Sequence, residues 1–356
     1  MEIKLTKAPE GHMPRPESDD KLGFGKYFTD HMFMMDYHVD KGWYDPRIVP
    51  YGSIELDPAA VVLHYGQQVF EGAKAYRGKN GGIYLFRTEK NLDRMNRSTV
   101  RLCMPQVPVD FLMEAHKELI LLDKEWIPHK AGCSLYIRPT MIATDAFLGV
   151  KPAKKYLFYT IIGPVGAYYP EGFKPTKMYV STDHVRAVRG GVGETKTGGN
   201  YAASLFAAEA AMKKGFTQVL WLDAIEKKYV EEVGTSNIFF LFEDELATPP
   251  LGGTILPGIT RDSVLQLTRS WGLKVSERPI SMDEVVNALN SGKLKEVFGT
   301  GTAAVISPVG SFCYLEKEYS VAGGTTGELS KKLYDTLTGI QYGELEDPFG
   351  WVHRIG

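Results

Sequence analysis

Strand-like and helix-like stretches follow one another in this chain without the regular alternation that a parallel α/β sheet requires. Short runs of β-branched and aromatic residues between positions 28 and 77 predict strands. Apolar residues at helical spacing predict helices over residues 88–101, with Leu92 and Met95 facing inward, and over residues 108–122. This mixture favours an α+β layout over a doubly wound sheet.

A segment rich in turn formers divides the 356 residues into two parts. Residues 166–177, GAYYPEGFKPTK, hold two prolines and two glycines between strand-like runs, which is typical of a linker. A chain of this length also exceeds what one hydrophobic core usually spans. We therefore expect a smaller N-terminal α/β domain over 1–165 and a larger mixed domain over 178–356.

Local signals predict several elements of the second domain. An alanine-rich helix starts near Asn200, a possible N-cap, and residues 229–242 have the pattern of a β-hairpin. A further helix is expected from about Arg261, with Thr260 as its cap. Two later helices carry capping boxes, Ser281 with Glu284 and Thr325 with Glu328.

Composition narrows the function classes. The net charge of −2 and the pI near 6.5 give no basic surface for nucleic acid or anionic membranes, and no apolar run reaches the ~18 residues of a membrane helix. Three widely spaced cysteines and a polar N-terminus favour a cytoplasmic protein. The histidines are scattered, so the sequence predicts no metal site. The GxSxG motif of serine hydrolases does not occur in the sequence, which argues against that class of enzyme.

One lysine stands among glycines in the stretch GGVGETKTGGNY, residues 190–201. The stretch fails the phosphate-loop pattern, because Thr195 precedes Lys196 where that pattern needs glycine. A solvated lysine in a flexible loop is the plainer interpretation. Glycines at 193, 198 and 199 instead suggest a backbone shaped to hold Lys196 still, as a Schiff-base lysine requires.

Two further turns suit an anion. The run FGTGTAAVISPV places exposed amides at Gly299 to Ala303, and residues 258–260 precede a predicted helix. The first turn also fits a dinucleotide fingerprint, which would make the chain a nicotinamide-dependent oxidoreductase. Pro308 and its β-branched neighbours argue against the helix that this fingerprint needs.

Seven motifs in order resemble those of branched-chain amino-acid aminotransferases, pyridoxal-phosphate enzymes of fold type IV. They are FEGAKAYRG, LFRTEKNLDRMNRS, LYIRPTMIATDAFLGV, GGVGETKTGGNYAASL, EEVGTSNIFF, ILPGITRDS and FGTGTAAVISPV. The resemblance runs from about Phe24 to Val309 without a large insertion. It implies a two-domain fold with pyridoxal 5′-phosphate between a smaller N-terminal and a larger C-terminal domain.

The resemblance also implies roles for individual residues. Lys196 would hold the cofactor and move the proton between the substrate and the cofactor. Glu232 would pair with the pyridine nitrogen, and Tyr201 would hydrogen-bond the ring oxygen. The residues implied to bind the phosphate are Arg94, Ile259, Thr260 and Thr302.

Substrate contacts follow from the same resemblance. An aromatic wall with one arginine would accept a branched aliphatic side chain and, in turn, the carboxylate of glutamate. The residues implied are Tyr65, Phe70, Tyr136, Arg138, Tyr168, Thr235 and Ala303. Leu148 and Val150 would reach into the site of a partner subunit, so a homodimer is implied. Ala304 and Ser307 stand where some mammalian members carry a redox CxxC, which excludes that thiol switch here.

The implied reaction is transamination of L-leucine, L-isoleucine and L-valine with 2-oxoglutarate, giving branched-chain 2-oxo acids and L-glutamate. Within the same fold, a D-amino-acid aminotransferase or an aminodeoxychorismate lyase is an alternative, against which Arg138 and the chain length argue. A scaffold that has lost catalysis is the other alternative, and the presence of Lys196 argues against it.

Overall fold

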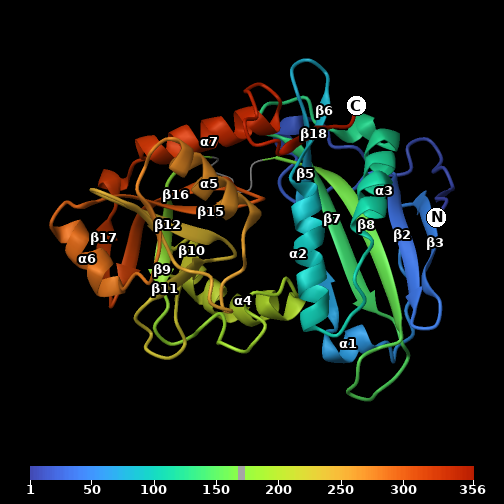
Figure 1. Ribbon diagram of the computed structural model, residues 1–356, viewed down its shortest axis with the longest axis horizontal. Helices are drawn as coiled ribbons and strands as arrows, with labels where there is room; N and C mark the ends of the chain where they lie inside the picture. The colour runs from blue at the N-terminus through green and yellow to red at the C-terminus, as the bar shows by residue number, and fades with distance from the viewer. Residues whose placement is uncertain (167–172) are drawn as a thin grey trace. The chain divides into compact units, whose positions relative to one another are not determined.

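The computed structural model describes residues 1–166 and 173–356, which form two compact units (Figure 1). Unit 1 comprises the described residues 1–166, 196–198 and 338–356, and unit 2 comprises residues 173–195 and 199–337. The chain therefore returns twice to unit 1 after entering unit 2. The predicted linker, residues 166–177, falls partly on residues outside the described ranges.

Unit 1 is built on a sheet of nine strands within the described ranges, in the order β1-β3-β2-β8-β7-β5-β6-β18, with β4 paired to β7. Apart from the parallel pair β1 and β3, neighbouring strands are antiparallel. The strands are β1 (Lys4–Leu5), β2 (His31–His38), β3 (Gly42–Pro50), β4 (Gln68–Phe70), β5 (Ala73–Arg77), β6 (Ile83–Phe86), β7 (Ser134–Ala143), β8 (Lys155–Val165) and β18 (Val352–Arg354).

Helices cover one face of this sheet. They are α1 (Val61–Tyr65), α2 (Thr88–Arg101) and α3 (Val109–Leu122), and Figure 1 shows α2 and α3 side by side against the strands. Both longer helices match their predicted ranges. Leu92 and Met95 are fully buried in the core between helices and sheet, which confirms the predicted inner face of α2. Such burial supplies most of a helix's stability in a folded protein.

Unit 2 contains a second nine-stranded sheet in the part of the chain that the structure describes, in the order β11-β10-β9-β16-β15-β12-β13-β14, with β17 paired to β16. The strands are β9 (Thr176–Val180), β10 (Gln218–Leu222), β11 (Val230–Val233), β12 (Asn237–Phe242), β13 (Leu246–Thr248), β14 (Val275–Glu277), β15 (Leu294–Gly301), β16 (Val305–Tyr314) and β17 (Lys317–Ser320). The helices are α4 (Gly198–Lys213), α5 (Ile259–Ser270), α6 (Met282–Asn290) and α7 (Glu328–Gln341), of which α4 and α7 each extend into a segment of unit 1.

The hairpin predicted over residues 229–242 is not formed. Strand β12 pairs with β13 on one side and with β15 on the other, so neither of its edges is available to β11. Strand β11 pairs with β10 instead, and a single bridge between Val233 and Ser236 closes the turn. By contrast, β15 and β16 form an antiparallel hairpin around the GTGTAA turn. Because a strand and not a helix follows that turn, the dinucleotide fingerprint is excluded.

Three predicted helix caps differ from the structure, and one is confirmed. Helix α4 begins at Gly198, while the Asn200 amide donates to the carbonyls of Val192 and Thr195 at 2.7 Å. Helix α5 begins at Ile259, with Gly258 at the N-cap position, so Thr260 lies inside its first turn. The Ser281 hydroxyl does accept the Glu284 amide at 3.1 Å, as predicted.

The first turn of α7 is capped from another element. The carboxylate of Glu296, on β15, accepts the amides of Leu329 and Ser330 at 2.8 and 2.9 Å. The predicted cap, Thr325, donates its hydroxyl to the carbonyl of Ala322 instead. The last residues of α7 and those that follow belong to unit 1, where β18 pairs antiparallel with β6 and forms one edge of the sheet.

Candidate active site

The segment of Lys196 is fixed by hydrogen bonds to other residues of unit 1. The amide of Lys196 donates to the Ser98 hydroxyl oxygen at 3.0 Å, and its carbonyl accepts the amide of Phe70 at 3.0 Å. The Thr197 hydroxyl donates to the carbonyl of Gln68 at 2.7 Å. The amide of Gly198 donates to the Gln68 side chain at 2.9 Å. The backbone around the lysine is therefore held on both sides.

The lysine amine lies over an aromatic ring. Nζ of Lys196 is 5.0 Å from the centre of the Phe70 ring, and the side chain is partly buried. Within the described ranges, this places two of the predicted site residues next to each other. It also supports the interpretation of the glycine-rich stretch as a holder for one lysine.

A buried ion pair lies on the inner face of α2. Nε and Nη2 of Arg94 donate to the two oxygens of Glu71 at 2.7 and 2.8 Å, and the Asn91 amide donates to Glu71 at 3.0 Å. Glu71 is 0% exposed and Arg94 is 4% exposed. Burial alone would raise the pKa of Glu71, but the charge of Arg94 and its hydrogen bonds, with the nearby charge of Lys196, hold that pKa below its ordinary value.

The sequence interpretation missed Glu71, Gln68 and Ser98. Glu71 stands inside the quoted motif FEGAKAYRG, but nothing in the sequence pairs it with Arg94 across 23 positions. Ser98 carries a usable signal. It follows Arg94 by four residues, so both lie on the same side of α2, and the hydroxyl reaches the lysine segment from there.

The predicted substrate residues of unit 1 form one composite surface. Arg138 and Tyr136 are two residues apart on β7 and so face the same side of the sheet. The guanidinium carbon of Arg138 lies 4.8 Å from the centre of the Phe70 ring and 5.1 Å from that of Tyr136, and Nη2 donates to the Tyr136 hydroxyl at 3.0 Å. Gly72 makes room for this arrangement, because a Cβ there would lie 2.1 Å from the Tyr136 oxygen.

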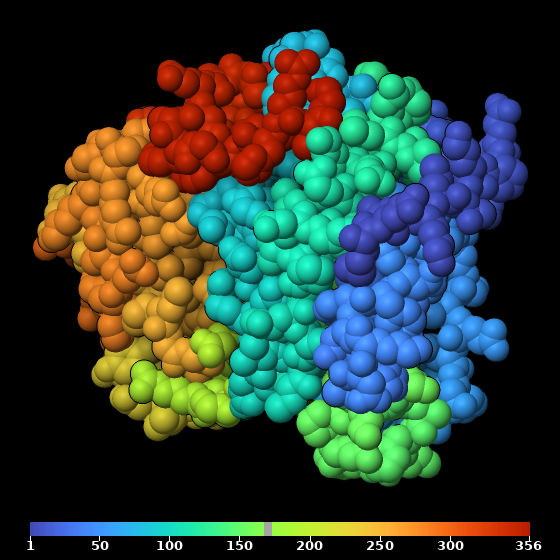
Figure 2. Space-filling model, turned by 45° about the vertical axis from the view of Figure 1, so that its right-hand side comes forward, coloured from blue at the N-terminus to red at the C-terminus, as the bar shows by residue number. Residues whose placement is uncertain are grey.

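The other predicted substrate residues of unit 1 lie more openly. Tyr65 ends helix α1 and is exposed. Leu148 and Val150 are 64% and 86% exposed, in a loop between β7 and β8 that protrudes from the unit in Figure 2, where it is coloured green. Tyr168 lies outside the described residues.

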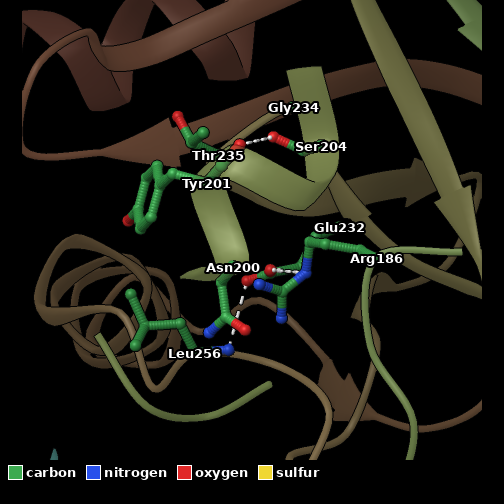
Figure 3. A pocket seen from close by; sticks show the side chains of 8 residues that line it. All are labelled: Arg186, Asn200, Tyr201, Ser204, Glu232, Gly234, Thr235 and Leu256. Carbon is green, nitrogen blue, oxygen red and sulfur yellow. Dashed lines mark hydrogen bonds and ion pairs between the residues drawn. The ribbon is translucent and has the colours of Figure 1, made fainter. Parts of the chain in front are cut away.

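Unit 2 carries a pocket around the predicted cofactor carboxylate (Figure 3). Glu232, on β11, is buried, and one of its oxygens lies 2.6 Å from Nε of Arg186. Its other oxygen accepts the Asn237 amide group at 2.9 Å and the Leu256 amide at 3.2 Å. The carboxylate is thus held by cationic and neutral donors from three segments.

Two more predicted residues line this pocket. Tyr201 extends from the first turns of α4, and Thr235 lies in the turn that follows β11. The Ser204 hydroxyl donates to the Tyr201 carbonyl at 2.7 Å. Tyr201, Thr235 and Glu232, which the sequence placed in one site, therefore share one pocket.

The predicted phosphate-binding residues of unit 2 lie at two turns. Ile259 and Thr260 are the first two residues of α5, where backbone amides have no partner inside the helix. Thr302 and Ala303 occupy the turn between β15 and β16. Both locations offer backbone amides of the kind that bind anions.

A larger pocket, of about 570 Å³, lies elsewhere on unit 2 and includes none of the predicted residues in its described lining. Its walls include Val188, Ile225 and Pro249, and the buried Glu231, whose pKa is raised by desolvation. Size alone would select this pocket. The chemistry of the lining selects the smaller one, where a carboxylate, a phenol and a threonine converge.

Residues 1–166 and 173–356 hold no group of three or more histidine, cysteine or acidic side chains arranged for a metal ion. None of the helices in these ranges combines the length and the apolar character that crossing a membrane demands.

The residues present fit pyridoxal phosphate. Its aldehyde needs an amine, which Lys196 offers, and its protonated ring nitrogen needs a buried carboxylate, which Glu232 offers. Its phosphate needs cationic and amide donors of the kind found at Arg94 and at the start of α5. Groups of the kinds that pyridoxal phosphate needs are thus present in both units, a lysine and an arginine in unit 1 and a buried carboxylate, a phenol and two amide-rich turns in unit 2.

Comparison with known proteins agrees with this chemistry. The family model for amino-transferase class IV matches residues 68–312, and the chain belongs to this family. Branched-chain-amino-acid aminotransferase 2 of Bacillus subtilis (strain 168) is 55% identical over 355 residues, which cover 100% of this chain and 96% of that protein. A probable branched-chain-amino-acid aminotransferase of Staphylococcus aureus (strain MRSA252) is 54% identical over 332 residues, covering 93% and 92%.

Solved structures give the same result for the fold. The branched-chain amino acid aminotransferase of Escherichia coli superposes with a TM-score of 0.76 at 28% identity and covers 92% of this chain and 100% of its own. A T.th. branched-chain amino acid aminotransferase, solved with pyridoxamine 5′-phosphate, superposes with a TM-score of 0.75 at 26% identity, covering 92% and 99%. The predicted mixed α/β fold of type IV is confirmed.

Proposed function

We propose that this chain is a branched-chain-amino-acid transaminase that uses pyridoxal 5′-phosphate and transfers the amino group of L-leucine, L-isoleucine or L-valine to 2-oxoglutarate. The observation that carries the proposal is the fixed backbone of Lys196, whose amide and carbonyl are both hydrogen-bonded although the residue lies outside the strands and helices. Full-length similarity to curated branched-chain aminotransferases supports the substrate class.

Each of three residues would have a separate role toward the cofactor. Bound pyridoxal phosphate supplies an aldehyde for the amino group and a ring that withdraws electrons from the substrate Cα. Lys196 would hold the cofactor and then move a proton to and from the substrate Cα. Glu232 would keep the ring nitrogen protonated, since a buried carboxylate favours a cation beside it. Tyr201 would donate to the ring oxygen.

Phosphate binding is assigned to donors of two kinds. Arg94 would contribute the charge, and its bond to Glu71 supports a fixed orientation of the guanidinium group. Backbone amides of Ile259 and Thr260, in the first turn of α5, would contribute neutral donors together with Thr302.

The composite surface of Phe70, Tyr136 and Arg138 explains how one site accepts two unlike substrates. The aromatic rings would contact an aliphatic side chain, whereas the guanidinium group lying against them would bind the side-chain carboxylate of glutamate or 2-oxoglutarate. Tyr65, Tyr168, Thr235 and the Ala303 amide would complete the contacts.

A homodimer is part of the proposal. Leu148 and Val150 expose apolar side chains at the tip of a loop, which supports their burial against a second copy of the chain and a role in its substrate site. Three cysteines outside any disulfide support the reducing environment of the cytoplasm.

Initial rates with L-leucine, L-isoleucine and L-valine, each with 2-oxoglutarate, test the proposal. We expect turnover with all three and none with D-leucine, the matched control. Turnover with D-leucine but not with L-leucine would replace the assignment by a D-amino-acid aminotransferase. Absence of any amino transfer by protein loaded with pyridoxal phosphate would refute it.

A further inference from the structure

The hydrogen bonds around Lys196 identify two side chains that have no role in the chemistry assigned above. Four bonds that hold residues 196–198 join them to Ser98, Gln68 and Phe70. The bond from Phe70 joins two backbone atoms, and the bond to the Gln68 carbonyl is donated by Thr197, which belongs to the lysine segment itself. The other two depend on the Ser98 hydroxyl and on the Gln68 amide oxygen.

Ser98 has the more direct contact. Its oxygen accepts the amide of Lys196 itself at 3.0 Å, and the side chain is 1% exposed on α2, one turn beyond Arg94. Loss of the hydroxyl would remove the acceptor of a partly buried amide, which is costly enough to shift the backbone. The shift would fall on the residue whose amine must reach a carbonyl carbon, where an error of about 1 Å can cost roughly 100-fold in rate.

We infer that Ser98, assisted by Gln68, is a positioning residue for Lys196: the Ser98 hydroxyl fixes the backbone from which the lysine amine reaches its target. This inference rests on the proposed function for its effect on rate. Its structural part concerns only residues of unit 1. Helix α2 would then serve the site twice, through Arg94 and, one turn later, through Ser98.

A matched pair of variants separates the hydroxyl from the shape of the side chain. Ser98→Thr keeps the hydroxyl. Ser98→Val introduces a side chain of nearly the same shape as threonine but without the hydroxyl. We expect Ser98→Val to lower kcat on the order of tenfold or more with KM for L-leucine within about threefold, and Ser98→Thr to retain most of the rate. Thr99→Val is the control, because the hydroxyl of Thr99 is equally buried but donates within its own helix, to the carbonyl of Asn96.

A second readout needs neither cofactor nor activity. Hydrogen exchange of the cofactor-free protein, followed by mass spectrometry on peptides covering 196–198, should be roughly tenfold faster in Ser98→Val than in Ser98→Thr or Thr99→Val. If the native protein showed no transamination, the proposed function would fail while this measurement still decided the role of Ser98.

The inference is overturned if Ser98→Thr and Ser98→Val behave alike in both kcat and exchange. Should neither variant fold, Gln68→Met and Gln68→Glu decide the question, since only Gln68→Glu keeps an oxygen for the Gly198 amide. We then expect the loss of rate and the faster exchange in Gln68→Met alone. Equal behaviour of these two variants would refute the inference.

Discussion

The buried pair of Glu71 and Arg94 gives a stability prediction with a definite size. Glu71→Gln keeps the volume of the side chain but removes its charge. Because Glu71 is 0% and Arg94 4% exposed, the guanidinium group would stay buried without its counter-charge. Breaking one partner of such a pair costs about 3–5 kcal/mol. We expect a loss of this size in the cofactor-free protein.

Thermal unfolding of the cofactor-free protein measures this loss. Unit 1 has roughly 190 residues, a size at which 1 kcal/mol shifts Tm by about 2–4 °C. Glu71→Gln should therefore lower Tm by about 6–20 °C. The control is Glu114→Gln, whose carboxylate pairs with Lys117 at 3.7 Å on the exposed face of α3. A surface pair of this kind is worth at most about 1 kcal/mol. Equal Tm values for Glu71→Gln and the native protein would refute this account of the pair.

The same pair predicts a pH dependence. The pKa of Glu71 is held below its ordinary value of 4.5, so its stabilising contribution is complete above pH 4.5 and is lost as the pH falls through the lowered pKa. Glu71→Gln has no carboxylate to protonate there. The gap in unfolding free energy between the native protein and Glu71→Gln should narrow in acid, and a gap that widens would contradict this sign.

Three further predictions concern separate parts of the chain. Glu232→Gln should lower kcat at least about tenfold, since one hydrogen bond to a charged group is worth about 1.5–3 kcal/mol and ~1.4 kcal/mol is tenfold in rate. Stopped-flow absorbance of the leucine half-reaction measures this. Burial lowers the pKa of His116 to about 4, so the free energy of unfolding should fall by up to about 3 kcal/mol between pH 6.5 and pH 4. In His116→Gln, the urea concentration at the unfolding midpoint should depend less on pH over that range. Val150→Asp should dissociate a dimer in ultracentrifugation and reduce activity, whereas the exposed Ile225→Asp should do neither.

Helices with a strong apolar period were predictable from the sequence because local burial decides them. The ranges of α2 and α3 and the Ser281 cap follow from residues within one or two turns. The strand pairs were less predictable, since β12 takes its partners from positions up to about 60 residues away and leaves β11 to β10. A cap supplied by Glu296 to a helix more than 30 residues later has no local signal at all.

The candidate site also combines residues that the local sequence indicates with residues whose roles depend on contacts between distant parts of the chain. Lys196, Tyr201 and Glu232 are predicted from the sequence because each stands in a motif that resembles those of a known family, and Tyr201 and Glu232 share one pocket in the structure. Glu71 and Ser98 escaped because their roles exist only where β4, α2 and the lysine segment meet in space. A polar residue at helical spacing from a functional one, as Ser98 is from Arg94, is the sequence signal that could find such supports.

The visible absorption spectrum of the purified protein loaded with pyridoxal phosphate tests the central claim most directly, because it would report a bond between Lys196 and the cofactor. We predict a yellow band that fades when L-leucine is added, and no such lysine-linked band in Lys196→Ala. A native protein that stays colourless after incubation with pyridoxal phosphate would contradict the account.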